Sequence, residues 1–318
     1  MTCIRCQHTV CVKAGSFGKR HIQRWKCTSC KNRFSEPHEK QTRDTFQSRP
    51  DAAARALQCL VEGCSIRSTE RLTGLNRNTI MRLLLLAGER SARLMDARMQ
   101  NLTTRYLQID EIWSFVGKKK RNRRPDDPPE VGDAWIFVAL DEETKLIPAF
   151  YVGRRLKPDT NMFLWNLYRR MNGRIQITTD GLVHYREGVP VAFGLDADFA
   201  QLTKMFGDFG QNDSPDGRYS PSPIKGVISK VRLGDPDPEH ISTSLVERAN
   251  LTMRMQIRRL TRLTNAFSKK LSHHRAAIAL HFAYYNFCRV HSSLRVTPAM
   301  EAGLTDHIWS IAELLGAA

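Results

Sequence analysis

Four of the eight cysteines stand in two Cys-x-x-Cys pairs near the start of the chain. The first pair is Cys3 and Cys6, and the second is Cys27 and Cys30. Each pair can present two thiolates from one tight turn, and two such turns complete a tetrahedral Zn²⁺ site. A redox-active pair is the alternative, but the βαβ surroundings of such a pair are missing. The spacing therefore predicts a zinc ribbon over residues 1–36, in which the metal supplies much of the folding free energy.

Three carboxylates occupy positions from which one catalytic site could be built. Asp110 lies within a strand-like segment, Asp180 follows another, and Glu247 lies early in a helix-like segment. Three carboxylates can hold two Mg²⁺ or Mn²⁺ ions about 4 Å apart, which activate the attacking oxygen and stabilise the leaving oxygen of a phosphodiester displacement. We therefore expect these three acids to be both the metal ligands and the catalytic residues.

Each of the three acids also has a simpler explanation. Asp110 could be a strand-edge carboxylate with Glu111 as its functional rival, and Asp180 begins an Asp-Gly dipeptide that is common in turns. Glu247 could pair with a neighbouring arginine on a helix surface. Two further acids are candidates for supporting or substitute roles, namely Asp141 and Asp196.

Basic and polar residues of the types that contact DNA gather in three segments. One is the first turn of a predicted recognition helix, which would reach base edges and phosphates. Another is a basic run after the first strand, which either lies along DNA or is a solvated loop. The third continues the helix face of Glu247, where arginines would hold the phosphate backbone. The candidate DNA contacts are Asn76, Arg77, Asn78, Thr79, Lys118, Lys119, Lys120, Asn250, Arg254 and Arg258.

The composition of the whole chain agrees with a polyanionic partner. Lys and Arg total 49 against 32 for Asp and Glu, so the formal net charge is +17, which favours DNA or RNA. The 318 residues have room for one large catalytic domain and one or two small modules. No apolar run is long enough to span a bilayer, and the first residues do not resemble a secretory signal. We therefore expect no membrane insertion and an intracellular protein, associated with the nucleoid in the cytoplasm if the host is bacterial.

The elements that must position the candidate DNA contacts are helical. Helices are predicted over residues 53–62, 66–73 and 77–90, and Asn76 can cap the third after a turn at Gly74. A short turn between the last two helices is typical of a helix-turn-helix. The sequence therefore predicts an all-α helix-turn-helix DNA-binding domain over residues 50–94. A three-helix bundle that contacts protein is the alternative.

The elements that must position the acids begin with strands. Strands are predicted over residues 106–116, 134–140, 147–152 and 174–179, with a helix from Pro158 between the last two. This order is that of an RNase H-like sheet, in which the fourth strand lies beside the first, so Asp110 and Asp180 should be neighbours. We predict an α/β fold whose RNase H-like catalytic core, a mixed five-stranded sheet with helices, spans residues 104–300. The remaining expectations are a loop around residues 210–223, a helix over 276–290 and a C-terminal helix over 301–318.

Several stretches of the chain resemble the insertion-sequence-one type DDE transposases. The most specific is Val-Glu-Arg-Ala-Asn-Leu-Thr-Met-Arg at residues 246–254, and the others span residues 3–30, 108–119, 133–136, 178–181, 258–262 and 267–269. The resemblance implies that Asp110, Asp180 and Glu247 form a DDE triad. It also implies that the ribbon and the helix-turn-helix bind the terminal inverted repeats of a transposon. Residues 284–299 resemble the end of retroviral-integrase-like transposase cores.

The expected activity is therefore DNA transposition on double-stranded DNA. Hydrolysis of a phosphodiester would free a 3′-OH, and that hydroxyl would attack target DNA. Because pairing two transposon ends needs two active subunits, we expect a homo-oligomer, such as a dimer on DNA. A catalytically silent DNA-binding regulator and a structure-specific nuclease of the same fold are the alternatives.

Overall fold

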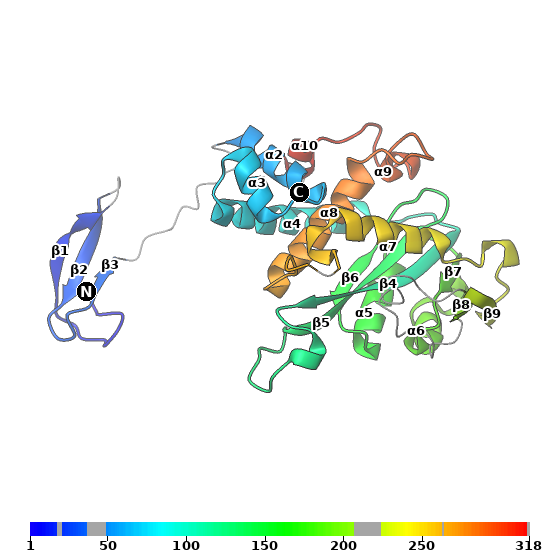
Figure 1. Ribbon diagram of the computed structural model, residues 1–318, viewed down its shortest axis with the longest axis horizontal. Coiled ribbons are helices and arrows are strands. Elements are labelled where there is room, and N and C mark those ends of the chain that lie inside the picture. Colours follow the sequence, from blue (N-terminus) through cyan, green and yellow to red (C-terminus); the bar gives the residue numbers. More distant parts are fainter. Residues whose placement is uncertain (18–20, 37–48, 207–223, 263, 317–318) are drawn as a thin grey trace. The chain divides into compact units, whose positions relative to one another are not determined.

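The computed structural model describes residues 1–17, 21–36, 49–206, 224–262 and 264–316 (Figure 1). The chain forms two compact units, Met1–Ser48 and Arg49–Ala318, which are described separately below. The loop predicted around residues 210–223 lies outside the described residues. No helix in the described part of the chain is both long and apolar enough to cross a bilayer.

The N-terminal unit is a three-stranded antiparallel sheet. Its strands are β1 (Cys11–Phe17), β2 (Ile22–Cys27) and β3 (Arg33–Ser35), with β2 in the middle. Its small core consists of Cys3, Cys27 and Phe34, with Cys30 packed against it. Because cysteines make up much of this core, few apolar contacts are available to stabilise the sheet.

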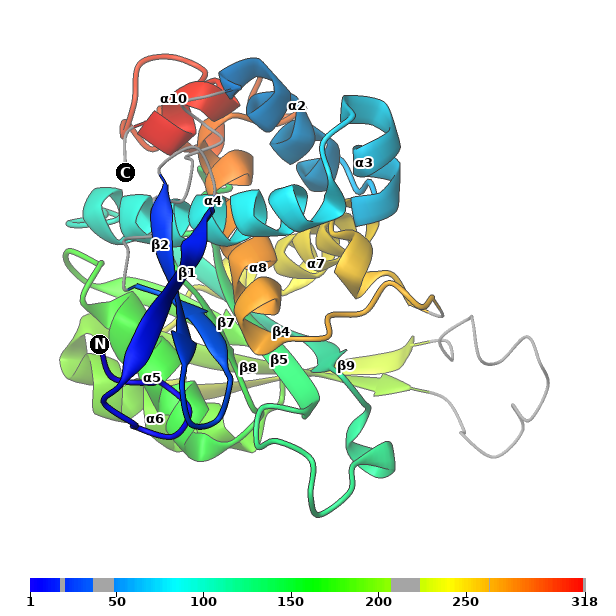
Figure 2. The ribbon, with the colours of Figure 1, turned by 90° about the vertical axis from the view of Figure 1, so that its left-hand side faces the viewer.

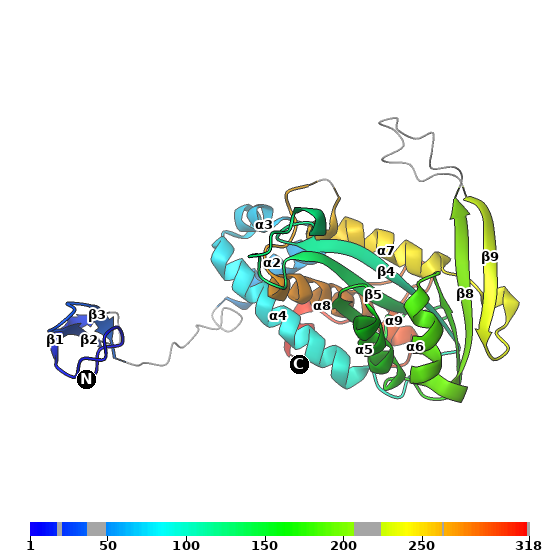
Figure 3. The ribbon, with the colours of Figure 1, turned by 90° about the horizontal axis from the view of Figure 1, so that it is seen from below.

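The large unit is built on a six-stranded mixed sheet. In spatial order the strands are β6 (Phe150–Gly153), β5 (Gly132–Asp141), β4 (Tyr106–Val116), β7 (Ile175–Thr179), β8 (Ala197–Phe206) and β9 (Ile224–Leu233). Strand β4 runs antiparallel to β5 and parallel to β7, so the predicted adjacency of the first and fourth strands is confirmed. The prediction of five strands was wrong. The sixth strand, β9, lies at the sheet edge (Figure 3) with most of its residues exposed, so its sequence lacks a buried apolar run.

Helices cover both faces of this sheet (Figure 1). Helices α5 (Lys157–Tyr168) and α6 (Val183–Phe193) pack on one face, where Leu107 and Ile109 of β4 join the core. Helix α7 (Ser244–Gln256) packs on the other face, where Gln108 accepts hydrogen bonds from the start of α7. Successive residues of β4 therefore point into different layers.

Three helices precede the sheet, α2 (Pro50–Val61), α3 (Ile66–Thr73) and α4 (Arg77–Arg98). The predicted cap of the third helix is confirmed, because the Asn76 side chain accepts a hydrogen bond from the Asn78 backbone at 2.9 Å. Helix α4 extends eight residues beyond the predicted end at Arg90, since Leu94 and Met95 continue its buried stripe.

Helix α4 crosses α8 (Leu271–Phe287) at close range (Figure 2). A Cβ atom on Gly88 would lie 2.4 Å from the Ala276 Cα atom, so glycine permits this approach. The three helices thus share one compact unit with the sheet, and the boundary predicted between residues 50–94 and 104–300 does not separate two compact units.

The C-terminal part differs from its prediction. Instead of one helix over residues 301–318, it has α9 (Pro298–Glu301) and α10 (Ile311–Gly316). The intervening chain turns at Gly303, which has φ of +68°. Residues Ile311, Leu314 and Leu315 of α10 are buried, and α10 packs on α2 and α4. The helix predicted over residues 276–290 corresponds to α8, which begins five residues earlier.

Candidate active site

Two of the predicted catalytic acids meet on the two central strands of the sheet, at the carboxyl end of β7. Asp110 lies midway along β4, and Asp180 comes directly after β7, the parallel neighbour of β4. Carboxylate oxygens of Asp110, Glu111 and Asp180 all lie within 4.8 Å of one another. The predicted proximity of Asp110 and Asp180 is therefore confirmed, and Glu111 joins them in a group of three acids.

Asp110 is held from the α7 side of the sheet. Its Oδ2 atom accepts a hydrogen bond from Asn250 Nδ2 at 2.8 Å. Burial, together with the charges of Asp180 and Glu247, raises the pKa of Asp110 to about 6, against the opposing effect of hydrogen bonds from the Glu111 backbone and Asn250. Carboxylates are crowded and desolvated here, and such crowding disfavours ionisation unless a cation compensates.

Glu111 lies on the opposite face of β4 and is buried, with 1% of its side chain exposed. Its Oε2 atom accepts from Arg155 Nε at 3.0 Å, and its Oε1 atom accepts from the Tyr185 hydroxyl. Burial raises the pKa of Glu111 to about 8, and the charge of Asp180 acts in the same direction. Both of its oxygens are therefore engaged within the protein.

Arg155 connects Glu111 to Asp180. Its Nη2 atom donates to Asp180 Oδ2 at 3.0 Å and lies 3.0 Å from Glu111 Oε2. The other Asp180 oxygen, Oδ1, accepts from the Leu182 backbone at 2.9 Å. Burial raises the pKa of Asp180, whereas Arg155 lowers it. A positive charge thus already lies where the acids converge.

Glu247 lies beside this group without belonging to it. It sits in the first turn of α7, where its Oε2 atom is 2.5 Å from Lys204 Nζ and its Oε1 atom accepts from the Thr243 hydroxyl at 2.7 Å. Its side chain is 42% exposed. The charge of Glu247 raises the pKa of both Asp110 and Asp180, so the third predicted acid belongs to the same electrostatic environment.

The two substitute acids have structural roles instead. Asp141 ends β5 and accepts hydrogen bonds from the Thr144 hydroxyl at 2.6 Å and the Glu143 backbone at 3.0 Å, so it stabilises a turn. Asp196 is exposed, and its Oδ2 atom accepts from the Tyr168 hydroxyl at 3.3 Å. Neither residue is in the group around Asp110.

The predicted DNA-contact face on α7 is only partly formed. Asn250 is buried, and its amide is engaged with Asp110. Arg254 is half-buried, and burial lowers its pKa. Helix α7 ends at Gln256 because Ile257 takes an extended conformation, so Arg258 falls in a following 3₁₀ turn. The prediction of one continuous helix face through Arg258 was wrong.

The basic loop follows β4 as predicted, but part of its charge is neutralised. Lys118 Nζ pairs with Asp127 Oδ1 at 2.6 Å. The Lys119 ammonium lies 5.7 Å from the centre of the Trp113 ring. Lys120 is exposed. Of the three lysines, Lys120 is therefore the most accessible to a phosphate.

The polar first turn of α4 lies on the surface. Arg77 and Asn78 are exposed and Thr79 is half-buried, while the side-chain oxygen of Asn76 is engaged in capping. Arg77 and Arg258, which come from separate predicted DNA-binding segments, line one cavity. The fold thus brings together basic residues that are far apart in the sequence.

The four cysteines converge in the N-terminal unit. Ligand atoms of all four lie within 4.8 Å of one another, and the Cys3–Cys30 and Cys6–Cys27 Sγ distances are both 3.6 Å. These distances are too long for a disulfide of about 2.05 Å. A tetrahedron with Zn–S bonds of about 2.3 Å has edges of about 3.8 Å. The arrangement therefore fits a four-thiolate metal site.

Comparisons with known proteins find similarity among solved structures. No family model and no curated protein matches the chain. Among solved structures, the chain is similar to a piggyBac transposase in a synaptic complex with hairpin DNA, with 12% sequence identity and a TM-score of 0.37. The similarity covers 89% of this chain and 73% of that chain. A likeness at this level does not establish a family or an activity.

Proposed function

We propose that this chain is a DNA transposase of the DDE type, related to the insertion-sequence-one group. The observation that carries the proposal is the convergence of Asp110 and Asp180 at the carboxyl end of the central strand β7, with Glu247 near enough on α7 to raise the pKa of both. The strand order supports an RNase H-like core with one added edge strand, because three antiparallel strands are followed by two parallel ones.

The acids suit a divalent-metal site. Asp110, Asp180 and Glu247 would hold two Mg²⁺ or Mn²⁺ ions, which when bound activate the attacking oxygen and stabilise the leaving oxygen. Glu247 is preferred over Glu111 because its side chain is 42% exposed against 1% for Glu111, and a ligand that faces substrate must be accessible. Lys204 would have to release Glu247 before that carboxylate reaches the other two acids.

Neighbouring side chains fix the geometry of the acids. Asn250 orients Asp110 by donating to Oδ2, and Arg155 orients Asp180 in the same way. Glu111 positions Arg155 and is in turn held by Tyr185. In the first step water attacks phosphorus and the 3′ oxygen leaves as a hydroxyl. In the second step that hydroxyl attacks a target phosphodiester and the 3′ oxygen of the target strand leaves as a hydroxyl, so no enzyme-linked intermediate is needed.

The remaining modules would bind the transposon ends. The four cysteines would hold Zn²⁺, since their spacing matches its tetrahedral geometry. The zinc ribbon and the exposed first turn of α4 would recognise the terminal inverted repeats, with Arg77 and Asn78 as the most accessible residues. A homodimer would hold two ends at once. Each of these assignments agrees with the net charge of +17.

The proposal is tested by strand cleavage and transfer on end-labelled DNA taken from the flanks of the gene. The native chain should cut and join this DNA with Mg²⁺, whereas Asp110→Asn and Asp180→Asn should bind it and do neither. Release of cut ends without joining would indicate a nuclease.

A catalytically silent DNA-binding regulator is the second candidate. It is favoured by the ion pairs that already neutralise Asp180 and Glu247, through Arg155 and Lys204. Binding by the native chain without cleavage, in either Mg²⁺ or Mn²⁺, would select this candidate.

A further inference from the structure

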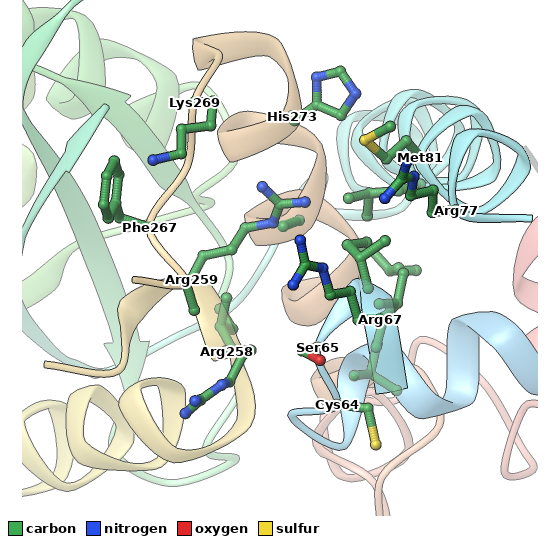
Figure 4. Close-up of a pocket in the computed structure, with 18 of the residues that line it drawn as sticks. Cys64, Ser65, Arg67, Arg77, Met81, Arg258, Arg259, Phe267, Lys269 and His273 are labelled. Atoms are coloured by element: carbon green, nitrogen blue, oxygen red, sulfur yellow. The ribbon is translucent and has the colours of Figure 1, made fainter. Parts of the chain in front are cut away.

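A cavity of about 720 Å³ lies between the first three helices of the large unit and the segment that follows α7. Its walls come from α2, α3 and α4 on one side, and from residues 257–281 on the other (Figure 4). None of the acids of the candidate active site lines it. The volume falls in the range of small-molecule sites, about 300–1,000 Å³.

The lining of this cavity is cationic, and no carboxylate belongs to it among the residues that the structure describes. Its basic residues are Arg67, Arg77, Arg258, Arg259, Lys269, Lys270 and His273. Within the described ranges, none of these arginines and lysines forms an ion pair with an acid. Such a concentration of positive charge repels itself, and it is stabilised when an anion binds between the cations.

Among the lining residues, Arg259 points most strongly to an anion-binding site. Burial lowers its pKa, and its one hydrogen bond to a side chain in the described chain is a 3.5 Å contact from Nη1 to the Ser268 hydroxyl. The guanidinium groups of Arg259 and Arg67 point toward one another across the cavity (Figure 4). Desolvating a charged group that has no counter-charge among the described residues costs free energy, and a phosphate between the two guanidinium groups would compensate that cost.

Much of the remaining lining is apolar, which a phosphate alone would not need. Leu84, Ile257, Phe267 and Leu280 contribute to the walls. His281 also lines the cavity, is 2% exposed, and has no hydrogen-bond partner for Nδ1 among the described residues. A nucleotide has the matching chemistry. Its phosphate suits the anion site, its base suits the apolar and aromatic walls, and a polar atom of the base could bind His281 Nδ1.

We propose that this cavity binds one unpaired nucleotide, with its phosphate between Arg67 and Arg259 and its base against the apolar wall beside His281. The chemistry is shared by a free nucleotide and by a nucleotide turned out of a DNA strand. A nucleotide turned out of a DNA strand is the better ligand, because Arg77, Lys269 and Lys270 provide further cations for the phosphates on either side of it. In this form the inference rests on the proposed DNA-binding function.

The test compares three labelled probes by fluorescence anisotropy with the full chain: a flush duplex, the same duplex with one unpaired thymidine, and the corresponding single strand. The native chain should bind the duplex with the unpaired thymidine about tenfold more tightly than the flush duplex. Arg67→Ala and Arg259→Gln should remove this preference. Ala277→Phe, which fills the cavity without changing its charge, should remove it as well.

The matched control is Arg93→Ala. Arg93 is an exposed arginine of α4 that pairs with Glu89 and does not line the cavity. Its replacement lowers the net charge by the same amount as the replacement of Arg67 or Arg259. This variant should keep the native preference. Arg67 is exposed on α3, so its variant remains informative if the other two fail to fold.

Other results of these binding measurements distinguish a free nucleotide from a nucleotide of a DNA strand, or overturn the cavity proposal. One such outcome is that thymidine monophosphate displaces the single strand from the native chain but not from the cavity variants, while the native chain binds both duplexes equally. This result would assign the cavity to a free nucleotide. Equal binding of all probes by the native chain and every cavity variant would overturn the cavity proposal and leave the proposed function standing. If the chain binds no DNA at all, the proposed function itself fails.

Discussion

The buried Glu111 should make the metal-free protein less stable as the pH rises. Glutamate ordinarily has a pKa of 4.5, whereas burial and the charge of Asp180 raise the pKa of Glu111 to about 8. Between these values the folded chain holds a proton that the unfolded chain releases. The stabilising contribution of protonated Glu111 is therefore complete below pH 4.5 and is lost as the pH rises through about 8.

The size of this effect follows from the two pKa values. Each pKa unit corresponds to about 1.4 kcal/mol, so the full difference amounts to roughly 5 kcal/mol at most. The side chain is 1% exposed, so solvent screening reduces this value little. Replacement by glutamine removes the titration but keeps an oxygen that can accept from Tyr185. The Glu111→Gln variant should therefore become more stable than the native chain at high pH.

Urea unfolding in the presence of a chelator measures the difference directly. Between about pH 5 and about pH 8, the free energy of unfolding of the native chain should fall by a few kcal/mol relative to Glu111→Gln. Glu143→Gln, which removes an exposed acid, should keep the native pH dependence. If the free energy of unfolding depends on pH in the same way for the native chain and Glu111→Gln, Glu111 titrates alike in the folded and unfolded states and its raised pKa is wrong.

Three further predictions concern individual contacts. Asn250→Ala should raise the Mg²⁺ concentration needed for half-maximal cleavage by about tenfold or more, since Asn250 orients Asp110; an unchanged Mg²⁺ titration would remove that role. Cys6→Ser should abolish stoichiometric zinc binding and unfold the N-terminal sheet, as judged by metal analysis and proton NMR, and a folded sheet without metal would contradict this. Gly88→Ala should lower the free energy of unfolding by about 1–3 kcal/mol because its Cβ would clash with Ala276, whereas Gly316→Ala, which has open space around it, should have no such effect.

Local patterns in the sequence predicted the elements that depend on near neighbours. The Asn76 cap, the start of α4 and the cysteine cluster each follow from spacing within a short segment. The adjacency of Asp110 and Asp180 followed from the order of strands and helix, because a crossover helix returns the chain beside the first strand.

Features that depend on distant packing were not predictable in the same way. Gly88 gave no sign that α4 would dock on α8, since the contact depends on Ala276. Asn250 had the spacing of a surface residue, yet its amide is buried against Asp110. The sequence offers Glu111 as a functional rival of Asp110, and alternate strand residues point to opposite faces, so nothing in it indicates that both acids join one group. Its part in the acid group depends on Arg155 and Tyr185, which lie far along the chain.

In the proposed function Glu247 completes the catalytic triad with Asp110 and Asp180. The decisive measurement is cleavage of end-labelled terminal DNA with Mg²⁺, compared between Glu247→Gln and Glu111→Gln. We expect Glu247→Gln to bind this DNA without cutting it, whereas Glu111→Gln still cuts at a reduced rate. Cleavage at the native rate by Glu247→Gln, together with complete loss in Glu111→Gln, would identify Glu111 as the third catalytic acid in place of Glu247.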